Sequence, residues 1–200
     1  MGGQAVARER LLVPLCLRVR SGTRLRIGPE RPGPVSKSVT ADSPGGQNVA
    51  GALVAFEWIN SKGERDSLQP APGHQVSWPV VDLHPSVRDR PLSINVSTSQ
   101  LPQRVEIRRF AGGIDEHGQP TEPPKTVECL ENGPVQALGQ CAFVTRSAST
   151  EVRWVASMQV EHVVLSIGWY VPRDYRANSR LTVESASWSF QFRDTPVPPT

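Results

Sequence analysis

The sequence predicts an all-β fold, an antiparallel β-sandwich that spans residues 49–193. Apolar and polar side chains alternate in several segments, and this two-residue period is typical of strands that bury one face. The 19 prolines and 16 glycines among 200 residues interrupt these segments at short intervals, which leaves little room for long helices. Turn signals at this spacing predict about seven to nine strands.

Segments 92–97 and 104–108 show the alternation most clearly. The apolar residues of 92–97 alternate with serine and asparagine, while Val105 and Ile107 alternate with arginine and glutamate. Each pattern predicts a half-buried strand. Because the connection between the two segments is short, we expect them to pair as antiparallel neighbours.

Three apolar stripes follow in the carboxyl-terminal half. They consist of Val152, Trp154, Ala156 and Met158; of Val163, Leu165, Ile167, Trp169 and Val171; and of Ala186, Trp188, Phe190 and Phe192. The second stripe is the longest and has further valines behind it, so we expect a central strand covered on both faces. The third alternates mainly with serines, so we expect its aromatic face to point inward and its serines to face water.

The segment 48–63 fits two different periods. Its apolar residues match a helix between an N-cap asparagine and a terminal glycine. They also match a strand with Val54, Phe56 and Trp58 on one face. We favour the strand, because Gly51 is costly inside a helix and the rest of the chain is predicted to be β.

Both ends of the chain are expected to lie outside the sandwich. Residues 1–48 read as a flexible basic arm and a Pro/Gly-rich linker, largely disordered, and residues 194–200 as a disordered tail. Residues 1–31 carry seven arginines against two glutamates, a local balance of +5. The remainder has 15 basic and 17 acidic side chains, so the folded body is near −2. That body lacks the positive field that phosphate backbones require, so we expect no nucleic-acid partner.

Neither export nor membrane insertion has a clear signal in the sequence. The apolar run at residues 11–17 is short, contains Pro14 and precedes arginines with no small-residue cleavage site, so it does not fit a signal peptide. No apolar run reaches the roughly 20 residues that a membrane-spanning helix needs.

Cys129 and Cys141 are the most informative pair of residues. They lie at the inner ends of two apparent strands, joined by residues 131–139. Neighbouring antiparallel strands can bring two Cα atoms to the roughly 5.5 Å that a disulfide needs. We therefore expect a disulfide and an extracytoplasmic or secreted location, with two independent buried thiols as the alternative. Two sulfurs without CxxC spacing or a nearby histidine do not make a metal site.

Three other residues are candidates for ligand contact. Asp82 and His84 lie on the same side of an extended segment and would suit a general base, although Pro85 favours a turn there. Trp78 is the candidate for a surface platform, because Pro79 marks an edge or a strand end. The other four tryptophans fall in register with core residues.

The remaining motifs predict structure rather than chemistry. His162 lies within an apolar strand and reads as a packed histidine. The glycine-rich segment 112–118 has too few carboxylates for calcium, so we expect a hairpin turn with Gly118 in the left-handed conformation. No GxSxG, GxxxxGK[ST], HExxH or GxGxxG pattern occurs.

The sequence thus predicts a sandwich of the class to which immunoglobulin-like and fibronectin-like domains belong, with no metal, cofactor or recognised catalytic residue. We expect a non-enzymatic extracytoplasmic module for protein interaction or surface assembly, with a protein partner or self-association. The alternatives are a carbohydrate or small-ligand binding module and a hydrolase with an unrecognised site. An open sheet edge would favour strand addition, and a concave pocket would favour ligand binding.

Overall fold

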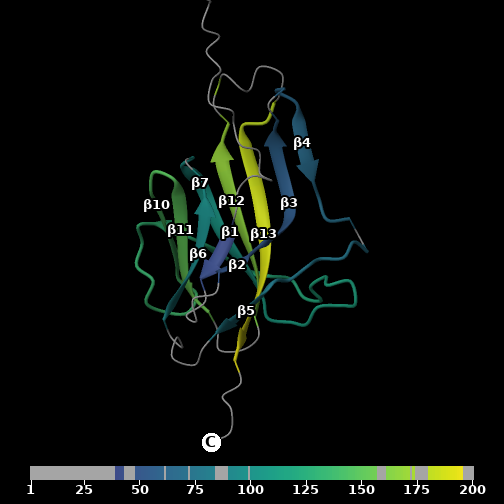
Figure 1. The fold of residues 1–200 in the computed structure, drawn as a ribbon, viewed down its shortest axis with the longest axis vertical. Helices are drawn as coiled ribbons and strands as arrows, with labels where there is room; N and C mark the ends of the chain where they lie inside the picture. The colour runs from purple at the N-terminus through teal and green to yellow at the C-terminus, as the bar shows by residue number, and fades with distance from the viewer. Residues whose placement is uncertain are drawn as a thin grey trace, which may run out of the picture. The chain divides into compact units, whose positions relative to one another are not determined.

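Two β-sheets pack face to face in the computed structural model, which confirms the predicted all-β sandwich (Figure 1). The structure describes residues 39–42, 48–60, 62–71, 73–83, 90–98, 100–156, 161–171, 173 and 180–195. The strands are β1 (Val39–Asp42), β2 (Asn48–Ala50), β3 (Ala52–Ile59), β4 (Arg65–Leu68), β5 (Val80–Leu83), β6 (Pro91–Ser97), β7 (Pro102–Phe110), β8 (Lys125–Glu128), β9 (Leu130–Glu131), β10 (Cys141–Thr145), β11 (Ser149–Val155), β12 (Glu161–Tyr170) and β13 (Val183–Asp194).

The strands divide into a six-stranded sheet A and a seven-stranded sheet B. Sheet A has the order β2-β1-β6-β11-β10-β9, and sheet B the order β4-β3-β13-β12-β7-β8. The long strand β13 lies between β3 and β12, and β5 pairs with its last residues (Figure 1). All pairings are antiparallel except β9 with β10 and β5 with β13.

The core lies between the sheets and includes residues of all three predicted apolar stripes. On β12, Val163, Leu165, Ile167 and Trp169 are buried, and this strand is central in sheet B as expected. The inward residues of β13, from Ala186 to Phe192, are likewise at most 2% exposed. The two layers meet where the rings of Trp154 on β11 and Phe192 on β13 pack edge to face, with centroids 5.1 Å apart. Aromatic contact of this kind adds to the burial of large apolar area.

The expected pairing of segments 92–97 and 104–108 is wrong. Both are strands, β6 and β7, but β6 pairs with β1 and β11 in sheet A, whereas β7 pairs with β12 and β8 in sheet B. The short connection therefore carries the chain from one sheet to the other. Alternation shows which face of a strand is buried, but strands of either sheet bury one face in the shared core. The pattern therefore does not tell which sheet a strand belongs to.

The segment 48–63 forms strands, as favoured, with one departure from the predicted face. Gly51 separates β2 from β3, and a Cβ atom at this position would run into the ring of Phe190. The pairing of β3 with β13 shifts in register at Trp188, so Leu53 packs against the core whereas Val54 lines an outer cavity. Because a bulge adds one residue to a strand, the residues beyond it point to the opposite face of the sheet from the one that strict alternation predicts.

The structured domain begins earlier than residue 49. Val39–Asp42 form β1, which pairs with β2 and β6, and the side chains of Val39 and Ala41 are buried. Only two apolar residues alternate here, which is too short a signal to separate a strand from a linker. Residues 1–38 and 196–200 lie outside the described part of the chain, as does Met158.

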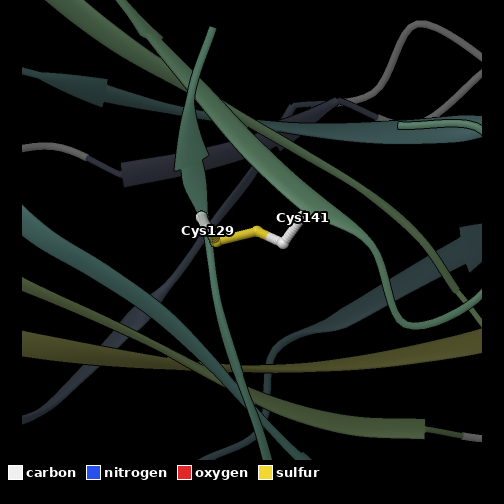
Figure 2. The surroundings of a disulfide bond; sticks show 2 residues. All are labelled: Cys129 and Cys141. Carbon is white, nitrogen blue, oxygen red and sulfur yellow. A yellow bond between two sulfur atoms is a disulfide. The ribbon is translucent and has the colours of Figure 1, made fainter. Parts of the chain in front are cut away.

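The expected disulfide joins Cys129 and Cys141, with 4.4 Å between their Cα atoms (Figure 2). The strand geometry differs from the prediction, because β9 and β10 run parallel and not antiparallel. Cys129 lies between β8 of sheet B and β9 of sheet A, at the point where the chain crosses between the layers. The bond therefore ties this crossing to the first residue of β10. Both cysteines are buried.

Candidate functional site

The edge strands offer little to a partner strand. Sheet A ends at β2 and β9, which have three and two residues. Sheet B ends at β4 and β8, four residues each, which carry Arg65, Asp66, Lys125 and Glu128. Short, charged edge strands are how proteins prevent pairing with other chains. The sheet faces are therefore the better candidates for a binding surface.

A trough crosses the outer face of sheet B over β13, β12 and β7, with a cavity volume of about 350 Å³. We call it the serine trough. It is lined by Gln103, Arg104, Glu106, Arg108, Ser166, Ile167, Gly168, Val183, Ser185 and Ser187. On its floor the hydroxyls of Ser166 and Ser187 are hydrogen-bonded at 2.8 Å.

The hollow follows from the sequence of the two central strands. In the part that lines the trough, most of their outward side chains are small, such as Ser166 and Gly168 on β12 and Ser185 and Ser187 on β13. Because successive side chains point to opposite faces, the large residues fill the core while the small ones leave the outer face low. The longer side chains of β7 then stand above this floor as a wall.

Three charged residues of β7 form that wall. Arg104 Nη2 lies 2.6 Å from Glu106 Oε1, and Arg108 Nη2 lies 3.7 Å from Glu106 Oε2. On its other side, Arg104 Nε is 3.6 Å from Glu128 Oε1. The Glu106 side chain is only 12% exposed, compared with 60% for Arg104, so the carboxylate is held low between the two guanidinium groups. The wall thus presents fixed donors and acceptors whose charges largely cancel.

Two loops, one with residues 69–71 and 73–79 and the other with residues 111–124, close one end of the trough. We call them the two-loop cap. The backbone N–H of Val76 donates to the carbonyl of His117 at 2.9 Å, and Gln119 Nε2 donates to the carbonyl of His74 at 2.8 Å. Gly118 has φ 74°, as predicted, and a side chain there would also collide with the backbone of Val76. Glycine therefore permits both the turn and the close approach of the loops.

Trp78 joins the cap to the sheet. Its indole N–H donates to the carbonyl of Gly118 at 2.7 Å. Its ring meets those of Phe110 and His162 edge to face, with centroids 6.0 and 5.0 Å away. A second cavity of about 220 Å³ lies here and shares Arg108 and Ser187 with the serine trough. Trp78 is thus half-buried at the end wall of this cavity, and its role as a surface platform stays a prediction.

The cap also corrects one prediction for β13. Its outward serines were expected to face water, but Ser189 is fully buried. Its hydroxyl donates to the carbonyl of Ser77 at 2.5 Å, within the loop that covers this end of the sheet. The periodicity of β13 gives no sign of this cover.

His162 is packed beneath the cap, as predicted. The side chain is 6% exposed, and burial lowers the pKa of the imidazole below its usual 6.5. Its Nε2 has no hydrogen-bond partner among the described residues. The group is therefore neutral at pH 7, since charging it would require the loss of hydration without a compensating contact.

The other predicted site residues do not join this surface. Asp82 Oδ1 accepts a hydrogen bond from Arg193 Nε at 2.7 Å, so its carboxylate faces a guanidinium. His84 lies outside the described residues. The structure instead brings together Ser166, Ser185 and Glu106, which the sequence analysis did not select. Their only signal is the regular spacing of small or polar residues opposite a buried stripe.

A third cavity, about 400 Å³, lies between β3, β4 and residues 69–70 and 74–77. Its lining includes Leu53, Leu68, Pro70 and Val76, with His74 as its one ionisable side chain among the described residues. It offers fewer fixed polar groups than the serine trough.

Within the described ranges, no three histidine, cysteine or acidic side chains gather closely enough to bind a metal ion. The same ranges contain no helix of the length and apolarity that crossing a membrane requires. Comparison with protein-family models, curated proteins and solved structures gave no match to this chain.

Proposed function

We propose that this chain is a non-catalytic binding module whose ligand lies in the serine trough. The observation that carries the proposal is a hollow with fixed polar groups along its length and an aromatic wall at one end. Ligand sites combine shape of this kind with a few well-placed polar groups. We prefer ligand binding, one of the alternatives that the sequence leaves open, to assembly through a sheet edge, because the edge strands are short and charged.

The polar groups of the trough suit binding better than catalysis. The Ser166 and Ser187 hydroxyls bond to each other, and no imidazole is among the residues that line the trough. The carboxylate of Glu106 lies between two guanidinium groups, 2.6 Å from Arg104 Nη2 and 3.7 Å from Arg108 Nη2, so its oxygens are already engaged by ion pairs. An activated nucleophile needs a base within hydrogen-bond reach, whereas the hydrogen bond between Ser166 and Ser187 joins the two hydroxyls to each other.

A location outside the reducing cytosol is part of the same proposal. It is supported by the Cys129–Cys141 disulfide, since such bonds persist mainly in oxidising compartments. The chain has three cysteines, so thiol labelling of the unfolded, unreduced protein isolated from its native compartment should detect only Cys16. Detection of three free thiols would contradict this location.

A fragment screen by NMR tests the site without assuming the ligand class. A chemically mixed library of small polar and aromatic molecules is added to the labelled full chain, and the backbone amide shifts are mapped. We expect the perturbations to gather at Arg104–Arg108, Ser166–Gly168 and Val183–Ser187. Perturbations that gather on the outer face of sheet A, or no binding at all, would refute the proposed site.

A further inference from the structure

We propose that the ligand of the serine trough is an uncharged polyhydroxylated chain, a neutral oligosaccharide. This inference rests on the proposed function and adds the chemical class of the ligand. Three properties of the surface support it: the balance of charge, the mixture of hydrogen-bond donors and acceptors, and the apolar wall at the capped end.

The charge balance disfavours ionic ligands. Arg104 and Arg108 both face Glu106, and Arg104 also faces Glu128, so two cations are matched by two carboxylates. An anionic ligand would have to displace these carboxylates from the guanidinium groups, and a cationic ligand would meet the guanidinium groups themselves. Specific binding of phosphate or carboxylate uses arginines that are free to make paired hydrogen bonds. A neutral ligand leaves the existing pairs intact.

The hydrogen-bonding groups match hydroxyls that both donate and accept. The wall supplies guanidinium donors on either side of a carboxylate acceptor, and the floor supplies the hydroxyls of Ser166, Ser185 and Ser187. A serine hydroxyl can donate one hydrogen bond and accept two, as can each hydroxyl of a sugar. These side chains are held by mutual contacts before the ligand arrives, which reduces the entropy lost on binding.

The capped end supplies the apolar surface that complements sugar C–H groups. Trp78 and Phe110 line the adjoining cavity together with Val76 and Pro120, while Gln119 contributes an amide. The hydrogen bond from the Trp78 indole to Gly118 fixes the ring. Amphipathic rings fixed in this way present a large contact area at low entropic cost.

The hollow is long enough for a chain and not only for a single sugar. The two adjoining cavities are lined by residues of β12 from Val164 to Gly168. At about 3.3 Å per residue this stretch covers about 13 Å, before the capped end is added. We therefore expect affinity to rise with the number of sugar units.

The test measures binding of defined oligosaccharides to the full chain by titration calorimetry. The probes are tetrasaccharides of β-1,4-glucose, β-1,4-N-acetylglucosamine, α-1,4-glucose and α-1,6-mannose, with a sulfated tetrasaccharide as the anionic comparison. We expect at least one neutral probe to bind more tightly than the sulfated one. It should also protect Trp78 from acrylamide, because the other four tryptophans are at most 2% exposed.

Matched variants locate the binding. Ser185→Tyr fills the trough on sheet B, and Ser93→Tyr places the same side chain on the outer face of sheet A. We expect at least a tenfold loss of affinity in the first variant and no change in the second. Arg108→Ala removes a wall donor from a half-exposed position and should also weaken binding, which keeps the test valid if Ser185→Tyr does not fold.

The outcomes separate the two proposals. If fragments map to the trough but no neutral tetrasaccharide binds, the ligand class is wrong and the site stands. If a sugar binds equally well to Ser185→Tyr and to the unaltered chain, the oligosaccharide inference is overturned at this site. If neither fragments nor sugars reach the trough, the proposed function fails as well.

Discussion

Removal of the Cys129–Cys141 disulfide should destabilise the domain by a measurable and calculable amount. The bond links positions 12 apart in sequence. In the chain-entropy model, closing a loop of roughly a dozen residues removes enough freedom from the unfolded chain to stabilise the fold by about 3 kcal/mol. The double variant Cys129→Ala, Cys141→Ala should therefore lose about that much free energy of unfolding, which is a large share of the 5–15 kcal/mol typical of domains.

Urea unfolding of the two proteins, followed by tryptophan fluorescence, measures the difference. The unaltered protein is compared with the double variant under non-reducing conditions and again with reductant present throughout unfolding. We expect the free energies to differ by about 3 kcal/mol without reductant and to converge when the bond is reduced. A difference below about 1 kcal/mol without reductant would refute the view that this bond constrains the crossing between the sheets.

Three further variants test the packing and electrostatics around the site. Gly51→Ala should lower the free energy of unfolding by about 1–3 kcal/mol in urea, because the new Cβ meets a core phenylalanine ring; Gly113→Ala, which faces open space, should change it by less than about 0.5 kcal/mol. Burial lowers the pKa of His162 in the folded state, so the unfolded chain binds the proton more readily and stability should fall as the pH drops below about 6.5. If the melting temperature of His162→Phe falls with pH as steeply as that of the unaltered protein, this explanation is wrong. Arg109→Met should lower the free energy of unfolding in urea by up to about 3–5 kcal/mol, because it removes a guanidinium partner of the buried Glu161 carboxylate; adding Glu161→Gln should recover part of the loss.

The fold class could be predicted because burial and periodicity coincide along the central strands. On β12 and β13, the apolar residues that recur at every second position, from Val163 to Trp169 and from Ala186 to Phe192, are buried in the structure. The choice of strand over helix for 48–63 was confirmed for a related reason. Gly51 is costly in a helix, but between two strands it gives room to the ring of Phe190.

Strand partners could not be predicted by the same reasoning. β6 and β7 follow each other closely in sequence yet belong to different sheets. The same apolar residues would be buried if the two strands paired within one sheet, so the periodicity does not choose between the two arrangements. The parallel pairing of β9 with β10 was missed for a similar reason, since Cys129 and Cys141 meet in either direction. The length of a connection limits which strands can be neighbours but does not choose among the sheets.

Among the predicted ligand candidates that the structure describes, only Trp78 lines a cavity of the candidate site. Trp78 was selected because Pro79 follows it, and the structure places it in the wall of a cavity. The serines of the floor gave no chemical signal, because serine on the outer face of a strand is ordinary. Their meaning depends on the register of β12 with β13, which brings Ser166 opposite Ser187, and on the β7 wall beside them.

A crystal structure of the full chain with the tightest-binding ligand from the two screens tests the central claim most directly. We predict that the ligand lies along the floor formed by Ser166 and Ser187, beside Glu106 and Arg108, with one end toward Trp78. A ligand seated on the outer face of sheet A or along an edge strand would contradict the assignment of the serine trough as the binding surface.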